Sequence, residues 1–190
     1  MRHSATALSV PGVLLISGHR VTDARGYFTE TYRAHEFARL GVEARFVQDN
    51  EAMSLEPGTL RGLHFQAPPH AQAKLVRVLS GAIFDVAVDI RAGSPDFGRW
   101  VGVRLDAEHG EQLYIPAGFA HGYCTLEPRT VVAYKCDAYY DAPSEGGLLF
   151  SDPAIGIDWP MPLERMILSD KDRLLPTLAE LRSPFEWEGA

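Results

Sequence analysis

The chain has 190 residues, of which 46% are hydrophobic and 23% charged, and its formal net charge is −7. This length suits a single domain spanning residues 1–190 with its own core. No apolar run is long enough to cross a bilayer, so we expect no membrane role. An acidic chain without a Lys/Arg cluster is also expected to have no nucleic-acid partner, because binding that backbone takes many cationic contacts.

Short segments with alternating or β-branched character recur between turn signals, which is typical of an antiparallel sandwich or barrel. Two further segments, 34–40 and 174–181, are predicted as short peripheral helices. The segments predicted as strands are, in chain order, 12–17, 27–32, 75–79, 83–89, 99–105, 111–115 and 130–136.

The segment 83–89 has two different faces. Asp85 and Asp89 share one face with Ala87, whereas Phe84, Val86 and Val88 lie on the other, because successive strand residues point to opposite sides. The segment is therefore predicted to carry an apolar face and a carboxylate face.

The only cysteines are Cys124 and Cys136, which form neither a disulfide framework nor a zinc-knuckle spacing. The early apolar run 13–16 is too short to be the core of a signal peptide. Both features predict a cytoplasmic protein.

Two stretches resemble the paired sequence signatures of the cupins. From Gly110 the chain reads Gly, five residues, Pro, one residue, Gly, two residues and then His121, which fits the second signature. In the first signature, Gly58 lies six residues before His64, and Lys74 lies seven before Gly81. The resemblance implies an all-β fold, a cupin jelly-roll β-barrel with a few short peripheral helices.

Many cupins bind a metal through two histidines and a glutamate of the first signature and one histidine of the second. Here Gln66 stands at the second histidine position and Lys74 at the glutamate position, so only His64 and His121 remain. Two neutral imidazoles beside an ammonium lack the ligand number and negative charge of usual sites. We therefore expect no metal, and we expect Lys74 to supply a fixed positive charge that can stabilise an oxyanion.

Further motifs make the resemblance more specific. In order and across nearly the whole chain, the sequence resembles the dTDP-4-dehydrorhamnose 3,5-epimerase family. The matching runs are Asp23–Glu30, Phe46–Asn50, Leu60–Gln66, Lys74–Arg77, Phe84–Arg91, Ser94–Pro95, Ile115–Gly122, Tyr134–Lys135, Asp158–Pro160 and Leu168–Asp172.

The resemblance implies inversion of carbons 3 and 5 of a 4-keto-6-deoxyhexose carried on dTDP, in dTDP-L-rhamnose biosynthesis. Both carbons flank the carbonyl, so each inversion removes an α-proton, forms an enolate and returns a proton to the opposite face. Such chemistry needs a base, an oxyanion stabiliser and an acid, and no cofactor.

The family pattern assigns roles to four residues. His64 would be the base, since an imidazole titrates near neutral pH. Asp172 would fix its tautomer, with Asp170 as a lower-ranked rival. Tyr134 would be the acid on the far side, and Lys74 would face the oxyanion with His121 nearby.

The nucleotide would be bound by residues matching the family pattern, with arginines suited to the diphosphate by their planar fork. The N-terminal strand of the family reaches the partner subunit, so Arg25 and Glu30 are expected to serve the neighbour's site, which implies a homodimer. The candidate binding residues are Arg25, Glu30, Gln48, Asn50, Arg61, His121, Tyr140 and Glu145, with Tyr139 offering a further aromatic face.

Each candidate also has a purely structural interpretation. Tyr134 could be a core tyrosine, His121 could tie a barrel rim together, and Glu145 could be a loop residue. Asp85 could support His64 or Lys74, or pair with a neighbouring strand. The remaining histidines match no motif and are predicted to lie on the surface; they are His3, His19, His35, His70 and His109.

Other functions remain open from the sequence. The protein could instead be a relative of these epimerases that inverts only carbon 3 or only carbon 5 of another dTDP-deoxysugar. It could also be a 4-keto isomerase of the same fold. A metal-dependent cupin oxygenase is disfavoured by Gln66 and Lys74, and a non-catalytic nucleotide-sugar-binding module by the combined base and acid residues.

Overall fold

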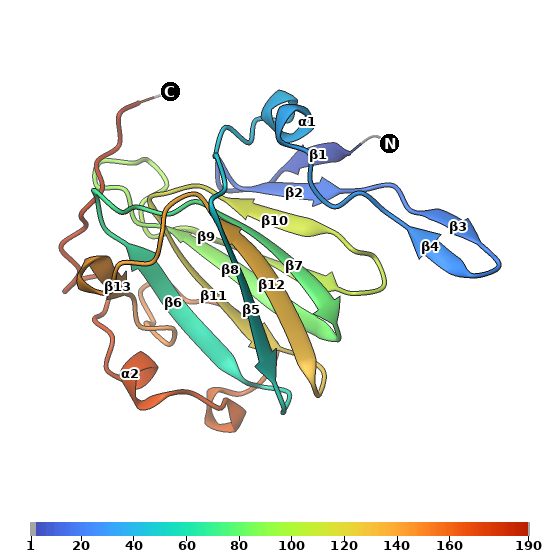
Figure 1. Cartoon of the computed structure of the whole chain (residues 1–190). Coiled ribbons are helices and arrows are strands. Elements are labelled where there is room, and N and C mark those ends of the chain that lie inside the picture. The colour runs from blue at the N-terminus through green and yellow to red at the C-terminus, as the bar shows by residue number, and fades with distance from the viewer. Residues whose placement is uncertain (1–2, 190) are drawn as a thin grey trace.

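The computed structural model describes residues 3–189, and two antiparallel β-sheets dominate it (Figure 1). The first sheet contains, in spatial order, β1 (Ser4–Ala7), β2 (Leu14–Ser17), β10 (Gln112–Ile115), β7 (Lys74–Ser80), β12 (Thr130–Cys136) and β5 (Gln48–Ser54). The second contains β13 (Glu145–Gly147), β6 (Leu60–Gln66), β11 (Phe119–Thr125), β8 (Ala82–Asp89) and β9 (Trp100–Asp106).

Neighbouring strands in both sheets are mostly distant in the sequence, as in a jelly roll. The helices are short and peripheral, so the predicted all-β class with a few short helices is confirmed. They are α1 (Ala34–Arg39), α2 (Asp170–Arg173) and the 3₁₀ turns η1 (Ala142–Ser144) and η2 (Leu163–Arg165).

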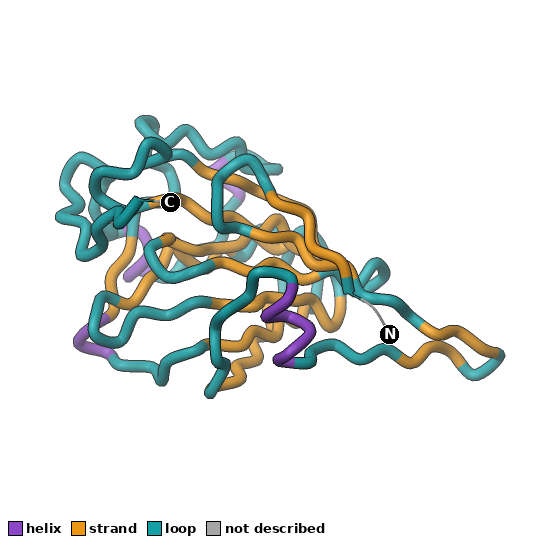
Figure 2. The backbone as a smooth tube through the Cα atoms, turned by 90° about the horizontal axis from the view of Figure 1, so that it is seen from above, coloured by secondary structure: helices purple, strands orange, loops and turns teal. Residues whose placement is uncertain are grey.

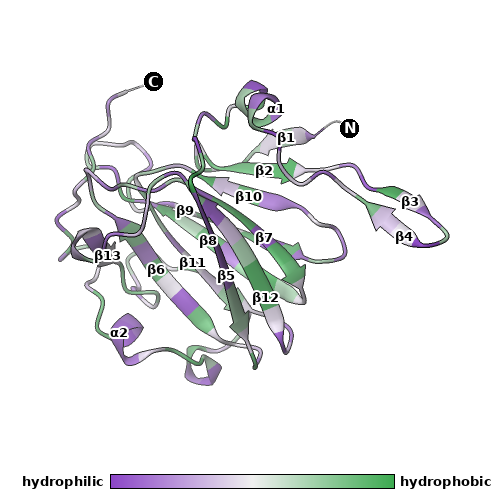
Figure 3. Cartoon of the chain, in the orientation of Figure 1, coloured by the Kyte–Doolittle hydropathy of each residue, from purple (hydrophilic) through white to green (hydrophobic). Residues whose placement is uncertain are grey.

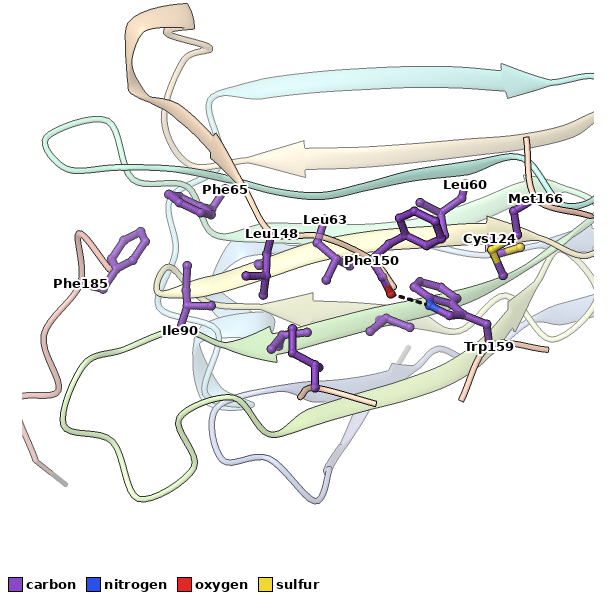
Figure 4. Packing of buried hydrophobic residues seen from close by; sticks show 14 residues of the cluster. Leu60, Leu63, Phe65, Ile90, Cys124, Leu148, Phe150, Trp159, Met166 and Phe185 are labelled. Atoms are coloured by element: carbon purple, nitrogen blue, oxygen red, sulfur yellow. Dashed lines mark hydrogen bonds between the residues drawn. The ribbon is translucent and has the colours of Figure 1, made fainter. Parts of the chain in front are cut away.

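The two sheets enclose an apolar interior. Val76 of β7 and Val132 of β12 meet Ala87 of β8 and Tyr123 of β11 there. A second cluster covers the outer face of the five-stranded sheet, where segments after β13 pack against β6, β8 and β11 (Figure 4). In that cluster the indole Nε1 of Trp159 donates to the carbonyl of Phe150 at 2.9 Å.

Strand β8 is consequently buried on both faces. Val86 and Val88 point into the outer cluster, while Asp85 and Asp89 are fully buried on the side of Ala87. The predicted carboxylate face thus points into the molecule and not toward solvent. Buried carboxylates need partners, and the partner of Asp85 lies in the candidate site.

A two-stranded hairpin, β3 (Val21–Asp23) and β4 (Gly26–Phe28), extends from the body of the two sheets (Figures 1 and 2). Its side chains Val21, Tyr27 and Phe28 are exposed. The predicted strand over 27–32 therefore ends at Phe28, and the residues that follow form a loop leading to α1.

Two predictions at the chain ends are wrong. Residues 174–181 are not helical, because Pro176 interrupts them and the Glu180 side chain binds Thr177 in a turn. His3 is buried and not on the surface, since its ring packs against Phe37 and its backbone binds Glu36. Within residues 3–189, no helix has the length and apolar character required to cross a membrane.

Candidate active site

A cavity of about 480 Å³ opens between the two sheets, and the segment 167–172 borders it. An adjoining pocket of about 260 Å³ shares His64, Lys74 and Tyr134 with this cavity. In Figure 3 the ribbon of α2 is coloured hydrophilic, and β6 carries hydrophilic segments between hydrophobic ones. The cavity brings together the predicted residues Arg61, His64, Lys74, His121, Tyr134 and Asp172.

His64 and Asp172 form a hydrogen-bonded pair. The His64 Nε2 lies 2.7 Å from Asp172 Oδ1, and the histidine side chain is 28% exposed while the carboxylate is almost buried. A carboxylate only accepts, so Nε2 carries the proton and Nδ1 is the basic nitrogen. Burial lowers the pKa of His64, and this outweighs the opposing effect of Asp172.

The helix α2 explains why Asp172 and not Asp170 faces the imidazole. Ser169 caps this helix by accepting from the backbone N–H of Asp172, which starts a turn after the extended segment 166–169. The turn buries Asp172 and leaves Asp170 exposed. Of the two candidate partners, the structure brings only Asp172 to His64.

His121 lies directly across from His64 in the β6–β11 pair. Its Nε2 is 2.7 Å from Oδ1 of the fully buried Asp85. Asp85 was expected to support His64 or Lys74, or to pair with a strand; instead it holds His121. The site thus contains two imidazole–carboxylate pairs on one sheet wall.

Lys74 projects into the cavity from β7, on the other sheet. Within residues 3–189 its amine forms neither an ion pair nor a hydrogen bond. Burial lowers its pKa, with the nearby Cys136 and Asp85 opposing that shift. An unpaired buried cation is costly, so its position favours an anionic or oxyanionic ligand.

Tyr134 faces His64 across the cavity, because it lies on β12 of the six-stranded sheet whereas His64 lies on β6 of the five-stranded sheet. Burial raises the pKa of its phenol, so the hydroxyl remains protonated. A base and a proton donor on opposite walls suit addition and removal of protons on opposite faces of a ligand.

Gln66, at the second histidine position of the cupin signature, holds neighbouring loops in place. Its amide nitrogen donates to the carbonyls of His70 and Tyr139, and its amide oxygen accepts from the backbone N–H of Asp141. These bonds hold two loops at the cavity rim. Within the described residues, no group of three or more His, Cys, Asp or Glu side chains is arranged to hold a metal.

The predicted nucleotide residues fall into two groups. Gln48, Asn50, Tyr140 and Glu145 line the adjoining pocket, and Arg61 lines the main cavity. Tyr139 is highly exposed close to this group. The structure brings these five residues to neighbouring walls of the two pockets.

Arg25 and Glu30 lie away from the cavity of their own chain. The Arg25 side chain is 90% exposed at the hairpin tip and pairs with Asp23, while Glu30 pairs with Arg33. Neither borders the cavity that contains His64.

Lys171 and Tyr123 are among the cavity-lining residues that the sequence did not predict. Lys171 pairs with Glu145 Oε2 at 2.6 Å, and its place between Asp170 and Asp172 in a matching motif was an available signal. Tyr123 lines the cavity from β11, two residues after His121, and no local pattern distinguishes it from a core tyrosine.

A sequence profile described as dTDP-4-dehydrorhamnose 3,5-epimerase matches residues 7–180. The protein of that name from Sinorhizobium fredii (strain NBRC 101917 / NGR234) is 49% identical over 181 residues, covering 95% of this chain and 92% of that protein. This chain belongs to the dTDP-4-dehydrorhamnose 3,5-epimerase family. The family consists of carbohydrate epimerases, a class of isomerases, so the resemblance seen in the sequence motifs is confirmed.

Solved structures of this epimerase family agree with the fold. The Bacillus anthracis enzyme with TDP and PPi bound has a TM-score of 0.89 and 47% identity, covering 92% of this chain and 99% of that chain. The Legionella pneumophila enzyme in complex with dTDP-4-keto-L-rhamnose has a TM-score of 0.93 and 41% identity, covering 100% of both chains. The predicted cupin jelly roll is therefore confirmed.

Proposed function

We propose that this protein inverts carbons 3 and 5 of dTDP-4-dehydro-6-deoxyglucose, in dTDP-L-rhamnose biosynthesis. The observation that carries the proposal is the convergence of the His64–Asp172 pair, Lys74 and Tyr134 on one cavity. Each inversion takes a proton from carbon, places two electrons on the carbonyl oxygen as an enolate, and returns a proton on the other face.

His64 takes the α-proton through Nδ1, and its Nε2–H remains bonded to Asp172. The carboxylate stabilises the imidazolium that forms. Because burial lowers the pKa of His64, the resting ring is neutral and able to act as a base at neutral pH.

Lys74 stabilises the enolate oxygen that develops at carbon 4. Within residues 3–189 its amine forms no ion pair, so its charge is available to the ligand. His121, on the opposite wall, lies within the same cavity and adds a second group beside that oxygen.

Tyr134 donates a proton to the enolate carbon from the wall opposite His64. After donation the phenolate takes up a proton from solvent. The imidazolium of His64 releases its proton to solvent, so the enzyme is regenerated. None of these steps is a redox step, and the hydrogen atoms on carbon are exchanged only with those of water.

Arg61, Gln48, Asn50, Tyr140 and Glu145 bind the dTDP portion beside the sugar cavity. Neither Arg25 nor Glu30 lines this cavity, and the hairpin β3–β4 that carries Arg25 extends from the sheets, which supports a homodimer in which each hairpin serves the neighbour's site. The two free buried thiols suit a cytoplasmic location, which we also propose.

The experiment is a coupled assay with dTDP-4-dehydro-6-deoxyglucose, a rhamnose-forming reductase and its nicotinamide donor. The proposal predicts dTDP-L-rhamnose as product. A product inverted at one carbon would identify a single-position epimerase instead, and activity that needs an added divalent ion after EDTA treatment would identify a metal-dependent cupin.

A further inference from the structure

The second imidazole–carboxylate pair, His121 with Asp85, has an additional neighbour. Asp85 on β8 lies directly opposite Tyr123 on β11 in the strand register. Directly opposed residues of an antiparallel pair project from the same face. Tyr123, Asp85 and His121 therefore share the inner face of one sheet.

Tyr123 contributes to the cavity wall and is only 4% exposed. Its ring centroid lies 6.3 Å from that of His121. Burial raises the pKa of its phenol, so the hydroxyl is a proton donor throughout the neutral range.

Two buried polar atoms in this cluster have no hydrogen-bond partner within residues 3–189. They are the Tyr123 hydroxyl and Oδ2 of Asp85, whose Oδ1 already accepts from His121. A buried polar atom without a partner is rare, because burial removes its hydrogen bonds to water without replacing them. One of these atoms is a donor and the other only accepts, so their hydrogen-bonding capacities are complementary.

Tyr123 is badly placed to be a second general acid. It lies on the same sheet as His64, because β6 and β11 are adjacent, whereas Tyr134 occupies the opposite sheet. A donor beside the base would return a proton to the face from which it came. The position of Tyr123 instead suits an action on its own neighbour, Asp85.

We propose that the Tyr123 hydroxyl donates to Oδ2 of Asp85 in the working enzyme and, through this carboxylate, orients the His121 imidazole at the cavity wall. Asp85 is then held at both oxygens, by Tyr123 and by His121. This fixes the His121 ring and directs its Nδ1 edge, the one not bonded to Asp85, to the ligand.

Tyr123 is thus a positioning residue for the proposed epimerisation, on which this inference rests. A phenylalanine at this position keeps the ring that packs in the interior and removes only the hydroxyl. Tyr114 provides a matched control, since it is a buried tyrosine on β10 that does not border the cavity.

The test is a double-mutant cycle with Tyr123→Phe, Asp85→Asn and both changes together, measured for kcat, KM and melting temperature, with Tyr114→Phe as control. Tyr123→Phe is expected to lower kcat roughly tenfold with little change in KM, the effect of one hydrogen bond to a charged group. It is expected to add nothing in the Asp85→Asn background, because the hydroxyl acts only through that carboxylate. Tyr114→Phe is expected to retain wild-type kcat.

Wild-type kcat in Tyr123→Phe, or an equal loss in the presence and absence of Asp85→Asn, would overturn the inference. An inactive wild-type enzyme would instead refute the proposed function. A crystal structure tests the inference independently of activity: a Tyr123–Asp85 hydrogen bond supports it, and a phenol hydroxyl bonded elsewhere opposes it.

Discussion

The two cavity histidines are alike in the sequence but differ in their surroundings. The His64 side chain is 28% exposed and pairs with Asp172, whereas the His121 side chain is 8% exposed and pairs with Asp85. A general base must reach its substrate, so accessibility favours His64 for proton transfer and His121 for hydrogen bonding to the ligand.

The Asp172→Asn change tests the pairing. It keeps the size of the side chain but removes the charge that stabilises imidazolium and selects the His64 tautomer. We expect kcat to fall roughly 10²- to 10⁴-fold, as for loss of acid–base catalysis, with KM little changed. Steady-state kinetics of Asp170→Asn provide the control, since Asp170 is exposed, and equal losses in both variants would argue against the assigned pair.

The pH profile of kcat/KM follows from the same surroundings. His64 acts as a base only when neutral, so activity is lost as pH falls through its pKa. Burial lowers that pKa, which places the acid limb below the ordinary value of about 6.5. Burial also lowers the pKa of Lys74, and activity is lost when its proton leaves, so the alkaline limb lies below about 10.5.

Lys74→Arg separates the two limbs. A guanidinium keeps its proton, so residual activity should persist to higher pH while the acid limb stays unchanged. An acid limb at or above the ordinary histidine value in the wild-type enzyme would be inconsistent with a buried His64 base.

At the scale of elements, local pattern predicted the helix α1 and seven strand segments, which correspond to β2, β4, β7, β8, β9, β10 and β12, but it did not predict β5 or β11. The helix that it predicted over residues 174–181 is wrong, because Pro176 interrupts the apolar pattern and does not fit the interior of a helix. It also could not show what Gln66 binds: its three hydrogen-bond partners come from loops brought together by the fold. Long-range contacts of this kind have no signature in neighbouring residues.

The β6–β11 pair sets the relative position of His64 and His121, and two glycines allow the strands to approach. A Cβ added at Gly62 would lie 2.6 Å from the Gly122 Cα, and Gly62 has a φ of +126°. The same Cβ would lie 2.7 Å from the carbonyl oxygen of His121. Both contacts are with backbone atoms, so the backbone itself would have to move.

Gly62→Ala is therefore expected to destabilise the protein by more than the roughly 1–2 kcal/mol that an unfavourable φ alone costs, and to lower activity. Gly93→Ala is the control, because Gly93 has a φ of +82° with open space around its Cβ position. Denaturant unfolding measures both. Equal destabilisation would mean that the close approach of the strands is unimportant.

At the scale of the whole molecule, the hairpin β3–β4 extends away from the sheets (Figure 2), and the resemblance to the family implied that the N-terminal strand serves a partner. The cavity itself is built within one chain, from both sheets and α2. Because Arg25 on this hairpin does not border the cavity of its own chain, we expect a homodimer in which each hairpin completes the neighbour's site.

Co-expression of Arg25→Ala chains with His64→Asn chains tests this arrangement. In a mixed dimer one site combines a wild-type His64 with the partner's wild-type Arg25, so random pairing should restore about a quarter of the sites. The control pairs His64→Asn with Asp172→Asn, which lie in the same chain's cavity and cannot complement. Similar activity in both mixtures would exclude exchange of hairpins between subunits.

The most direct test of the account is deuterium incorporation from deuterated water into dTDP-4-dehydro-6-deoxyglucose, followed at each carbon by NMR. The wild-type enzyme should place deuterium at carbons 3 and 5, and a folded His64→Asn variant should place it at neither. Incorporation by that variant at the wild-type rate would contradict the assignment of His64 as the base that removes both protons.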